Sequence, residues 1–174
     1  MNYQKSIYDA RAFAIAKHDG QKYSTYPYEV HLGNVVTALM RFGILPDCDA
    51  NYQLLAAGWL HDVLEDTDAT YSELETAFGT AIAQMVFCVT DEEGVNRKER
   101  KAKTYIKLAQ NPDAVIVKLA DRIANTEFCL VHGNQSLFAM YKKEQPGFQE
   151  ALSPAIRAGV AEKMMEYLNM LFGK

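Results

Sequence analysis

Cysteine is scarce in this sequence. There are three cysteines among 174 residues, Cys48, Cys88 and Cys129, and no two of them are spaced as Cys-x-x-Cys. The odd number and the spacing argue against a disulfide framework and against a cysteine-based zinc site. We therefore expect three small hydrophobic side chains in a reducing cytoplasm.

Long apolar runs are also missing. No window approaches the roughly 18 apolar residues of a membrane span, and the first six residues lack the apolar run of a signal peptide. The formal net charge of -4 argues against a general binder of nucleic acid or of acidic membranes, which needs a basic surface. We expect a soluble cytoplasmic protein that binds neither. A local basic pocket for a small phosphorylated ligand remains compatible with this charge.

Strict alternation of apolar and polar residues, the pattern of a half-buried strand, is hard to find. Apolar residues at spacings of three and four are frequent, and hydrophobic residues make up 49% of the chain. At roughly 100–200 residues per domain, the length corresponds to one domain. The sequence predicts an all-α fold, a single compact multi-helix domain over residues 1–174.

Capping residues and apolar spacing divide the chain into helices. Thr70-x-x-Glu73 is a capping-box pattern, and Asn111-Pro112 and Ser153-Pro154 are typical helix starts. Loops are expected at 132–134 and at 145–147, around a short helix. The other predicted helices cover residues 3–18, 27–42, 52–66, 70–78, 80–90, 98–110, 112–130 and 154–171.

Charged side chains lie at the end of the most hydrophobic of these helices. Residues 54–60 are nearly all apolar, and His61-Asp62-Val63-Leu64-Glu65-Asp66 follows directly. In one continuous helix, His61 and Glu65 share a face, and so do Asp62 and Asp66. Such residues suit a site, because protein cores exclude charge unless it is paired or bound to metal. The alternative is a helix that simply reaches the surface, with solvated acids.

Two further positions carry polar groups where apolar ones are expected. Asp121 lies in line with Val117 and Ala124 on the buried stripe of its helix, and Asn125 follows one turn later. The alternative for Asp121 is a buried ion pair with Arg122 or another base. His31 lies near the start of the second predicted helix, where a lone histidine is usually a core or surface residue.

Together, His31, His61, Asp62 and Asp121 form a mixed nitrogen and oxygen donor set. Such a set suits manganese, iron or another first-row divalent ion rather than structural zinc. Glu65 and Asp66 could then hold a water or pass a proton. This combination of side chains is typical of metal-assisted hydrolysis of phosphate esters.

The ordered motifs resemble the HD phosphohydrolase superfamily, and specifically the hydrolase domain of the RelA/SpoT alarmone enzymes. The resemblance covers about residues 10–130. The length leaves no room for a synthetase domain, so the chain resembles the stand-alone small alarmone hydrolases. The motifs that carry it are Tyr28-x-x-His31, His61-Asp62-Val63-Leu64-Glu65-Asp66-Thr67 and Lys118-Leu119-Ala120-Asp121-Arg122, with His18-Asp19-Gly20-Gln21-Lys22, Phe78-Gly79, Val89-Thr90-Asp91 and Arg97-Lys98-Glu99-Arg100-Lys101 in support.

The resemblance implies an all-α bundle that holds one Mn(II) per chain. It implies that the small-molecule partner is guanosine tetra- or pentaphosphate, ppGpp or pppGpp, whose 3′-pyrophosphate is removed to give GDP or GTP and pyrophosphate. It does not decide whether the chain forms a homo-oligomer.

By position, the resemblance implies a role for each site residue. His31, His61, Asp62 and Asp121 match the metal ligands, and Glu65 and Asp66 match the acidic pair that supports the attacking water. The predicted contacts to the nucleotide are Lys22, Tyr28 and Asn125. Leu32 and Ala124 depart from the family pattern, away from the metal set.

The basic helix that starts at residue 98 has two interpretations. Arg97, Lys98 and Lys101 could form a phosphate clamp at the mouth of the pocket, or they could lie on a solvated helix face. Two other functions also remain open. One is an HD-family phosphohydrolase of another nucleotide, such as an NADPH phosphatase or a nucleoside phosphate hydrolase. The other is a non-enzymatic alarmone-binding module.

Overall fold

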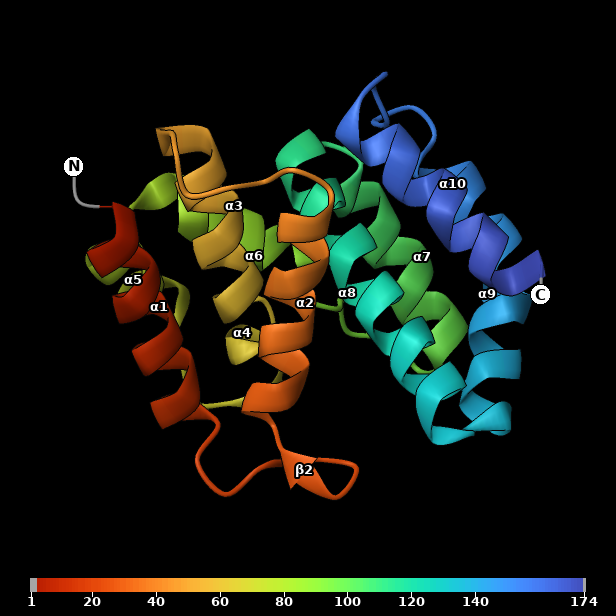
Figure 1. Ribbon diagram of the computed structural model, residues 1–174, viewed down its shortest axis with the longest axis horizontal. Helices are drawn as coiled ribbons and strands as arrows, with labels where there is room; N and C mark the ends of the chain where they lie inside the picture. The colour runs from red at the N-terminus through yellow and green to blue at the C-terminus, as the bar shows by residue number, and fades with distance from the viewer. Residues whose placement is uncertain (1–2, 174) are drawn as a thin grey trace.

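The computed structural model describes residues 3–173, and helices make up most of this range (Figure 1), which confirms the predicted all-α class. Residues 1, 2 and 174 of the predicted domain lie outside the described residues. The helices are α1 (Tyr3–Lys17), α2 (Glu29–Arg41), α3 (Asp49–Leu60), α4 (Val63–Asp66), α5 (Tyr71–Phe78), α6 (Thr80–Val89), α7 (Arg97–Leu108), α8 (Pro112–His132), α9 (Gln135–Leu152) and α10 (Val160–Gly173).

Helix α8 is the central element of the fold. It packs against α2, α3, α6, α7, α9 and α10. In Figure 1 the helices from α1 to α6 lie on one side of it, and α7, α9 and α10 lie on the other. Its side chains Val117, Leu119, Ala120 and Ile123 are fully buried. A polar group on this helix, such as Asp121, is therefore held deep inside the molecule.

A short hairpin precedes α2, and the sequence pattern did not predict it. Strands β1 (Lys22–Tyr23) and β2 (Tyr26–Pro27) pair antiparallel, with Lys22 opposite Pro27 and Tyr23 opposite Tyr26. The predicted start of the second helix at Pro27 is therefore wrong, because Pro27 belongs to β2 and α2 begins at Glu29. The hairpin lies beside the N-terminal end of α2 (Figure 1).

Two capping predictions, at Thr70 and at Asn111, are confirmed. In each case a side chain accepts from a free N–H group at the start of a helix. The capping box of Thr70 and Glu73 is present at α5, and Asn111 accepts a hydrogen bond from Ala114 N at the start of α8. Gly133 ends α8 in the left-handed conformation, with φ of 69°.

Two predictions near the C-terminus are wrong: the loop at 145–147 and the helix start at Ser153-Pro154. Residues 145–147, including Pro146, lie inside α9, and the last helix begins at Val160 rather than after Ser153-Pro154. Packing explains α9, because Phe148 and Leu152 are buried and Gln145 donates to Asn169 of α10 at 2.9 Å. These contacts outweigh the roughly 3 kcal/mol that an interior proline costs.

The predicted single helix over 52–66 is also wrong. It divides into α3 and α4, with His61 and Asp62 between them. Among residues 3–173, no helix is both long and apolar enough to cross a membrane. Cys88 and Cys129 are buried and Cys48 is exposed, all three as free thiols.

Candidate functional site

The break between α3 and α4 presents His61 and Asp62 to the interior. The Nδ1 atom of His61 lies 2.9 Å from the carbonyl oxygen of Gly58. Because a carbonyl only accepts, Nδ1 carries the proton and Nε2 offers a lone pair. Gly58 lies close to α2, since a Cβ at this position would meet Leu39 Cδ1 at 2.8 Å. The close packing of the two helices thereby fixes the carbonyl that orients His61.

Four side chains from three separate parts of the chain converge at this point. The Nε2 atoms of His31 and His61 lie 3.1 Å apart. Asp62 Oδ2 lies 3.3 Å from His31 Nε2 and 3.0 Å from His61 Nε2. Asp121 Oδ1 lies 3.4 Å and 3.8 Å from the same two nitrogens. The cluster is deeply placed, since His31 is 2% exposed and His61 is 1% exposed.

The chemistry of this donor set fits a divalent metal ion. Ligand atoms of His31, His61 and Asp121 lie within 4.8 Å of one another, and Asp62 adds a second carboxylate. Two imidazole lone pairs and two carboxylates at contact distance repel one another unless a cation lies among them. A histidine whose other ring nitrogen donates to a backbone carbonyl is the usual arrangement at metal sites.

Without a metal, the cluster attracts a proton. Burial alone would lower the pKa of His31, but the carboxylates of Asp121 and Asp62 raise it to about 9. Burial alone would raise the pKa of Asp121, but Lys118 and the two imidazoles hold it well below its usual range. The carboxylates therefore remain charged and favour a cation at this place.

A second set of hydrogen bonds holds the two carboxylates. The Tyr28 hydroxyl donates to Asp62 Oδ2 at 2.6 Å and also lies 3.0 Å from Asp66 Oδ2. Burial and the neighbouring Asp62 raise the pKa of Tyr28, so its hydroxyl keeps its proton. Asn125 Nδ2 donates to Asp121 Oδ1 at 2.5 Å. Such outer contacts orient ligands and sharpen a metal site.

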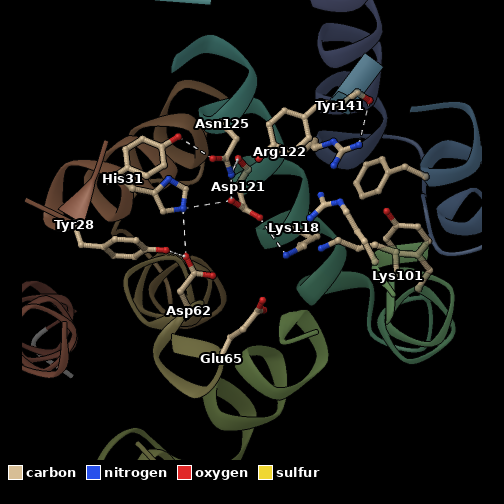
Figure 2. A pocket seen from close by; sticks show the side chains of 14 residues that line it. Tyr28, His31, Asp62, Glu65, Lys101, Lys118, Asp121, Arg122, Asn125 and Tyr141 are labelled. Carbon is tan, nitrogen blue, oxygen red and sulfur yellow. Dashed lines mark hydrogen bonds and ion pairs between the residues drawn. The ribbon is translucent and has the colours of Figure 1, made fainter. Parts of the chain in front are cut away.

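The cluster opens into a cavity of about 200 Å³. Figure 2 shows His31 and Asp62 on one side of it and Lys101 on the other, with Lys118 between them in contact with Asp121. The lining residues are Tyr23, Tyr28, His31, Asp62, Glu65, Arg97, Lys101, Tyr105, Lys118, Asp121, Arg122, Asn125, Tyr141 and Phe148. The cavity is therefore lined by carboxylates and by cations, one of which, Lys118, contacts the cluster directly.

Acidic neighbours hold the two lysines that line the cavity, Lys101 and Lys118, in place. Lys118 Nζ lies 3.1 Å from Asp121 Oδ2, and Lys101 Nζ lies 2.8 Å from Asp91 Oδ1. Burial alone would lower the pKa of Lys118, but Asp121 and the carboxylates beyond it raise it. Burial and the positive charge of Lys118 lower the pKa of Lys101. A phosphate in the cavity would meet both charges.

Glu144 of α9 joins the two arginines that line the cavity. Its Oε1 lies 2.6 Å from Arg97 Nε, and its Oε2 lies 3.1 Å from Arg122 Nη1. Arg122 is 6% exposed, and its guanidinium carbon lies 4.5 Å from the ring centroid of Tyr141 and 5.1 Å from that of Phe148. This packing fixes the guanidinium rigidly.

The structure separates the predicted acidic pair. Glu65 lines the cavity, and its Oε2 accepts a hydrogen bond from the backbone N–H of Asp91 at 3.0 Å. Burial raises the pKa of Glu65. Asp66 turns instead to Tyr28 and to Gln21, whose Nε2 donates to it at 3.0 Å. The predicted shared faces of a continuous helix are wrong here, because α3 ends at Leu60.

Most predicted site residues meet at this cavity, and some do not. His61 belongs to the four-residue cluster of His31, His61, Asp62 and Asp121, but it does not line the cavity. Lys22 is exposed on β1. Lys98 does not line the cavity but lines an adjoining groove between α7 and α9, which shares Arg97 and Lys101 with the cavity. The substrate roles of Lys22 and Lys98 remain predictions. The predicted residues that line the cavity are Tyr28, His31, Asp62, Glu65, Arg97, Lys101, Asp121 and Asn125.

Sequence reasoning missed several residues of the cavity as site residues. Lys118 and Arg122 flank Asp121 within an apolar helix. The alternative of an ion pair with Arg122 or another base is met by Lys118, which pairs with Asp121, whereas Arg122 pairs with Glu144. Their charge inside a buried helix was a usable signal. Tyr141 and Phe148 come from α9, and no local pattern marks them.

A family model described as HD domain matches residues 10–143. A guanosine-3′,5′-bis(diphosphate) 3′-pyrophosphohydrolase of Aquifex aeolicus is 36% identical over 128 residues, which are 71% of this chain and 18% of that protein. The enzyme of the same name called MESH1 in Danio rerio is 34% identical over 117 residues, or 65% of this chain and 63% of that one. The chain thus matches less than two thirds of the length of either relative.

A solved structure is similar over nearly the whole chain. It is described as a metazoan ortholog of SpoT that hydrolyzes ppGpp and plays a role in starvation responses. The TM-score is 0.75 at 26% identity, and the match covers 97% of this chain and 96% of that one. The fold is therefore shared with that protein.

Proposed function

Since the chain belongs to the HD domain family, we propose that it is a metal-dependent hydrolase that removes the 3′-pyrophosphate of ppGpp and pppGpp. The products are GDP or GTP and pyrophosphate. The relatives that carry this activity in their names support the proposal. One observation carries it within this molecule: a nitrogen and oxygen ligand cluster opens into one small cavity that four cations also line.

His31, His61, Asp62 and Asp121 would hold the metal, which we propose to be one Mn(II) per chain. A divalent ion in such a site supplies a water of lowered pKa and neutralises charge on the reacting phosphate. The mixed donor set without sulfur favours manganese or iron over structural zinc.

Glu65 would take a proton from the attacking water. It faces the cavity, the N–H of Asp91 fixes its carboxylate, and burial raises its pKa toward the working range of a general base. Asp66 has a supporting role, because its partners are Gln21 and Tyr28 and the hydroxyl of Tyr28 also holds Asp62.

The phosphate oxygens would bind to the four cations that line the cavity, which are Arg97, Lys101, Lys118 and Arg122. Their fixed positions let them stabilise negative charge that grows on the departing groups, without reorganisation during the reaction. Asn125 lies between Asp121 and Tyr23 at the opposite side of the cavity, where the nucleotide would contact it. The proposal implies that the substrate is a small phosphorylated nucleotide. It also implies that the protein acts in a reducing cytoplasm.

The test is a comparison of substrates with one protein preparation. Purified protein with Mn(II) is incubated separately with ppGpp, pppGpp, NADPH and deoxynucleoside triphosphates, and the products are separated by ion-exchange chromatography. We expect ppGpp to give GDP and pyrophosphate, and the Asp62→Ala variant to be inactive.

Dominant turnover of NADPH or of a nucleoside triphosphate would replace the substrate in this proposal. Tight binding of ppGpp without turnover would identify a binding module instead. Full turnover by the Asp62→Ala variant would contradict the assignment of Asp62 to the ion.

A further inference from the structure

Tyr23 of β1 connects the hairpin to one carboxylate of the ligand cluster. Its hydroxyl donates to Asn125 Oδ1 at 2.8 Å, and Asn125 Nδ2 donates in turn to Asp121 Oδ1 at 2.5 Å. That same oxygen of Asp121 faces His31 Nε2 and His61 Nε2. A chain of two hydrogen bonds thus runs from the hairpin to a proposed metal ligand.

The direction of both hydrogen bonds is determined. A charged carboxylate can only accept, so Asn125 must turn its NH₂ group toward Asp121. Its carbonyl oxygen then faces Tyr23, which must donate. A tyrosine hydroxyl carries its proton at neutral pH, so it can donate to this oxygen. The NH₂ group of Asn125 also donates to the backbone carbonyl oxygen of Asp121 at 3.1 Å, so Asp121 holds the nitrogen side of the amide and Tyr23 holds its oxygen side.

The ring of Tyr23 is itself fixed. It stacks on His31 at a centroid distance of 4.7 Å, with 26° between the planes, and contacts Phe128 at 4.4 Å. It therefore packs against one proposed ligand while its hydroxyl reaches another through Asn125. Residues that orient ligands in this way typically change metal affinity by about 10–100-fold when they are removed.

We propose that Tyr23 is a positioning residue of the metal centre, whose hydroxyl holds Asn125 so that Asn125 keeps Asp121 Oδ1 directed toward His31 and His61. The inference rests on the proposed function, because it takes Asp121 to be a metal ligand. It assigns to the hairpin a role that none of the metal motifs contains.

The experiment measures Mn(II) affinity rather than turnover. Free Mn(II) is followed by electron paramagnetic resonance during titration of the wild type, Tyr23→Phe, Asn125→Ala and the double variant. Tyr23→Phe keeps the stacked ring and removes only the hydroxyl. We expect it to weaken Mn(II) binding about 10-fold. The double variant should bind as weakly as Asn125→Ala alone, because Tyr23 acts through Asn125.

Tyr26→Phe is the matched control on the same hairpin. Tyr26 lines a separate groove between α2 and α8, and its ring contacts Phe128 and His132. Its Mn(II) affinity should equal that of the wild type. Thermal unfolding in EDTA checks that each variant folds without metal.

The outcomes separate this inference from the proposed function. A wild type that binds no Mn(II) contradicts the metal site itself, and the inference with it. A wild type that binds while Tyr23→Phe binds equally well overturns only the role of Tyr23. Effects of the two single variants that multiply in the double variant also overturn it, because Tyr23 would then act independently of Asn125.

Discussion

The Nε2 atoms of His31 and His61 face each other across 3.1 Å, although 30 residues separate them in the sequence. His61 carries its proton on Nδ1, which points at Gly58 O, so its Nε2 offers a lone pair. Two imidazoles can share one hydrogen bond, but the approach of two carboxylates to the same point adds negative charge. Their geometry is that of ligands around a cation.

Glu65 and Asp66 should differ in their effect on turnover. Glu65 faces the cavity, whereas Asp66 contacts Gln21 and Tyr28. Glu65→Gln should lower kcat by roughly 10²–10⁴, the usual contribution of a general base, and leave Mn(II) affinity nearly unchanged. Asp66→Asn should lower kcat far less. Steady-state kinetics with ppGpp tests both variants, and equal losses would contradict the assignment of the proton transfer to Glu65.

Lys101 should contribute to substrate binding rather than to metal binding. Its ammonium lines the cavity, and a charge-assisted hydrogen bond to phosphate is worth about 1.5–3 kcal/mol. Lys101→Met should therefore lower kcat/KM for ppGpp by about 10–100-fold. The control is Lys103→Met, since Lys103 pairs with Glu99 on the outer face of the same helix. Similar losses in both variants would indicate a general charge effect.

Glu144 should stabilise the fold in a pH-dependent way. Burial alone would raise its pKa, but Arg97 and Arg122 lower it from 4.5. A lowered native pKa means that the stabilisation is present above the unfolded pKa near 4.5 and disappears as the pH falls toward the native pKa. Glu144→Gln should lower the free energy of unfolding by about 1–3 kcal/mol at pH 7.

Urea unfolding of the wild type and of Glu144→Gln between pH 7 and pH 3.5 measures this difference. The difference between the two curves should begin to shrink below about pH 4.5, the unfolded value, and should continue to shrink as the pH falls toward the native pKa. Glu150→Gln, an exposed position of the same helix, is the control. A difference that stays constant over this range would show that the charge of Glu144 is not the cause.

Gly58 should be intolerant of a side chain. A Cβ there would meet Leu39 Cδ1 at 2.8 Å and Val36 Cγ2 at 3.3 Å, so α2 and α3 would have to separate. Gly58→Ala should lower the free energy of unfolding by about 1–3 kcal/mol. At Gly33, a Cβ would meet Trp59 only at 3.7 Å, so Gly33→Ala should be neutral or gain up to about 1 kcal/mol of helix propensity. Thermal or urea unfolding compares them, and an equally stable Gly58→Ala would contradict the close approach.

The helices that local chemistry defines were predictable. Thr70 and Asn111 cap their helices as their side chains suggest, and the buried position of Asp121 follows from its spacing to Val117 and Ala124. The convergence of His31, His61, Asp62 and Asp121 was also predictable, because polar groups lie where apolar ones are expected. Their role as metal ligands stays a prediction. These features depend on periodicity and on the cost of burying charge.

What could not be predicted depends on contacts between distant parts of the chain. The break at His61 and Asp62 lacks a glycine or proline, and its partners are Tyr28 and Asp121. Pro146 remains inside α9 because α10 packs on it through residues such as Gln145. Glu144, which joins two arginines of the cavity, is an ordinary acid in the sequence. Only the tertiary arrangement gives these residues their roles.

The most direct test of this account is the stoichiometry of Mn(II) bound by the purified chain, measured by equilibrium dialysis with metal analysis. The account predicts one Mn(II) per chain in the wild type, and a loss of binding of at least about 100-fold in Asp62→Ala and in His61→Ala. A wild type that binds no stoichiometric metal, or ligand variants that bind it as tightly as the wild type, would contradict the proposal that these four residues hold one ion.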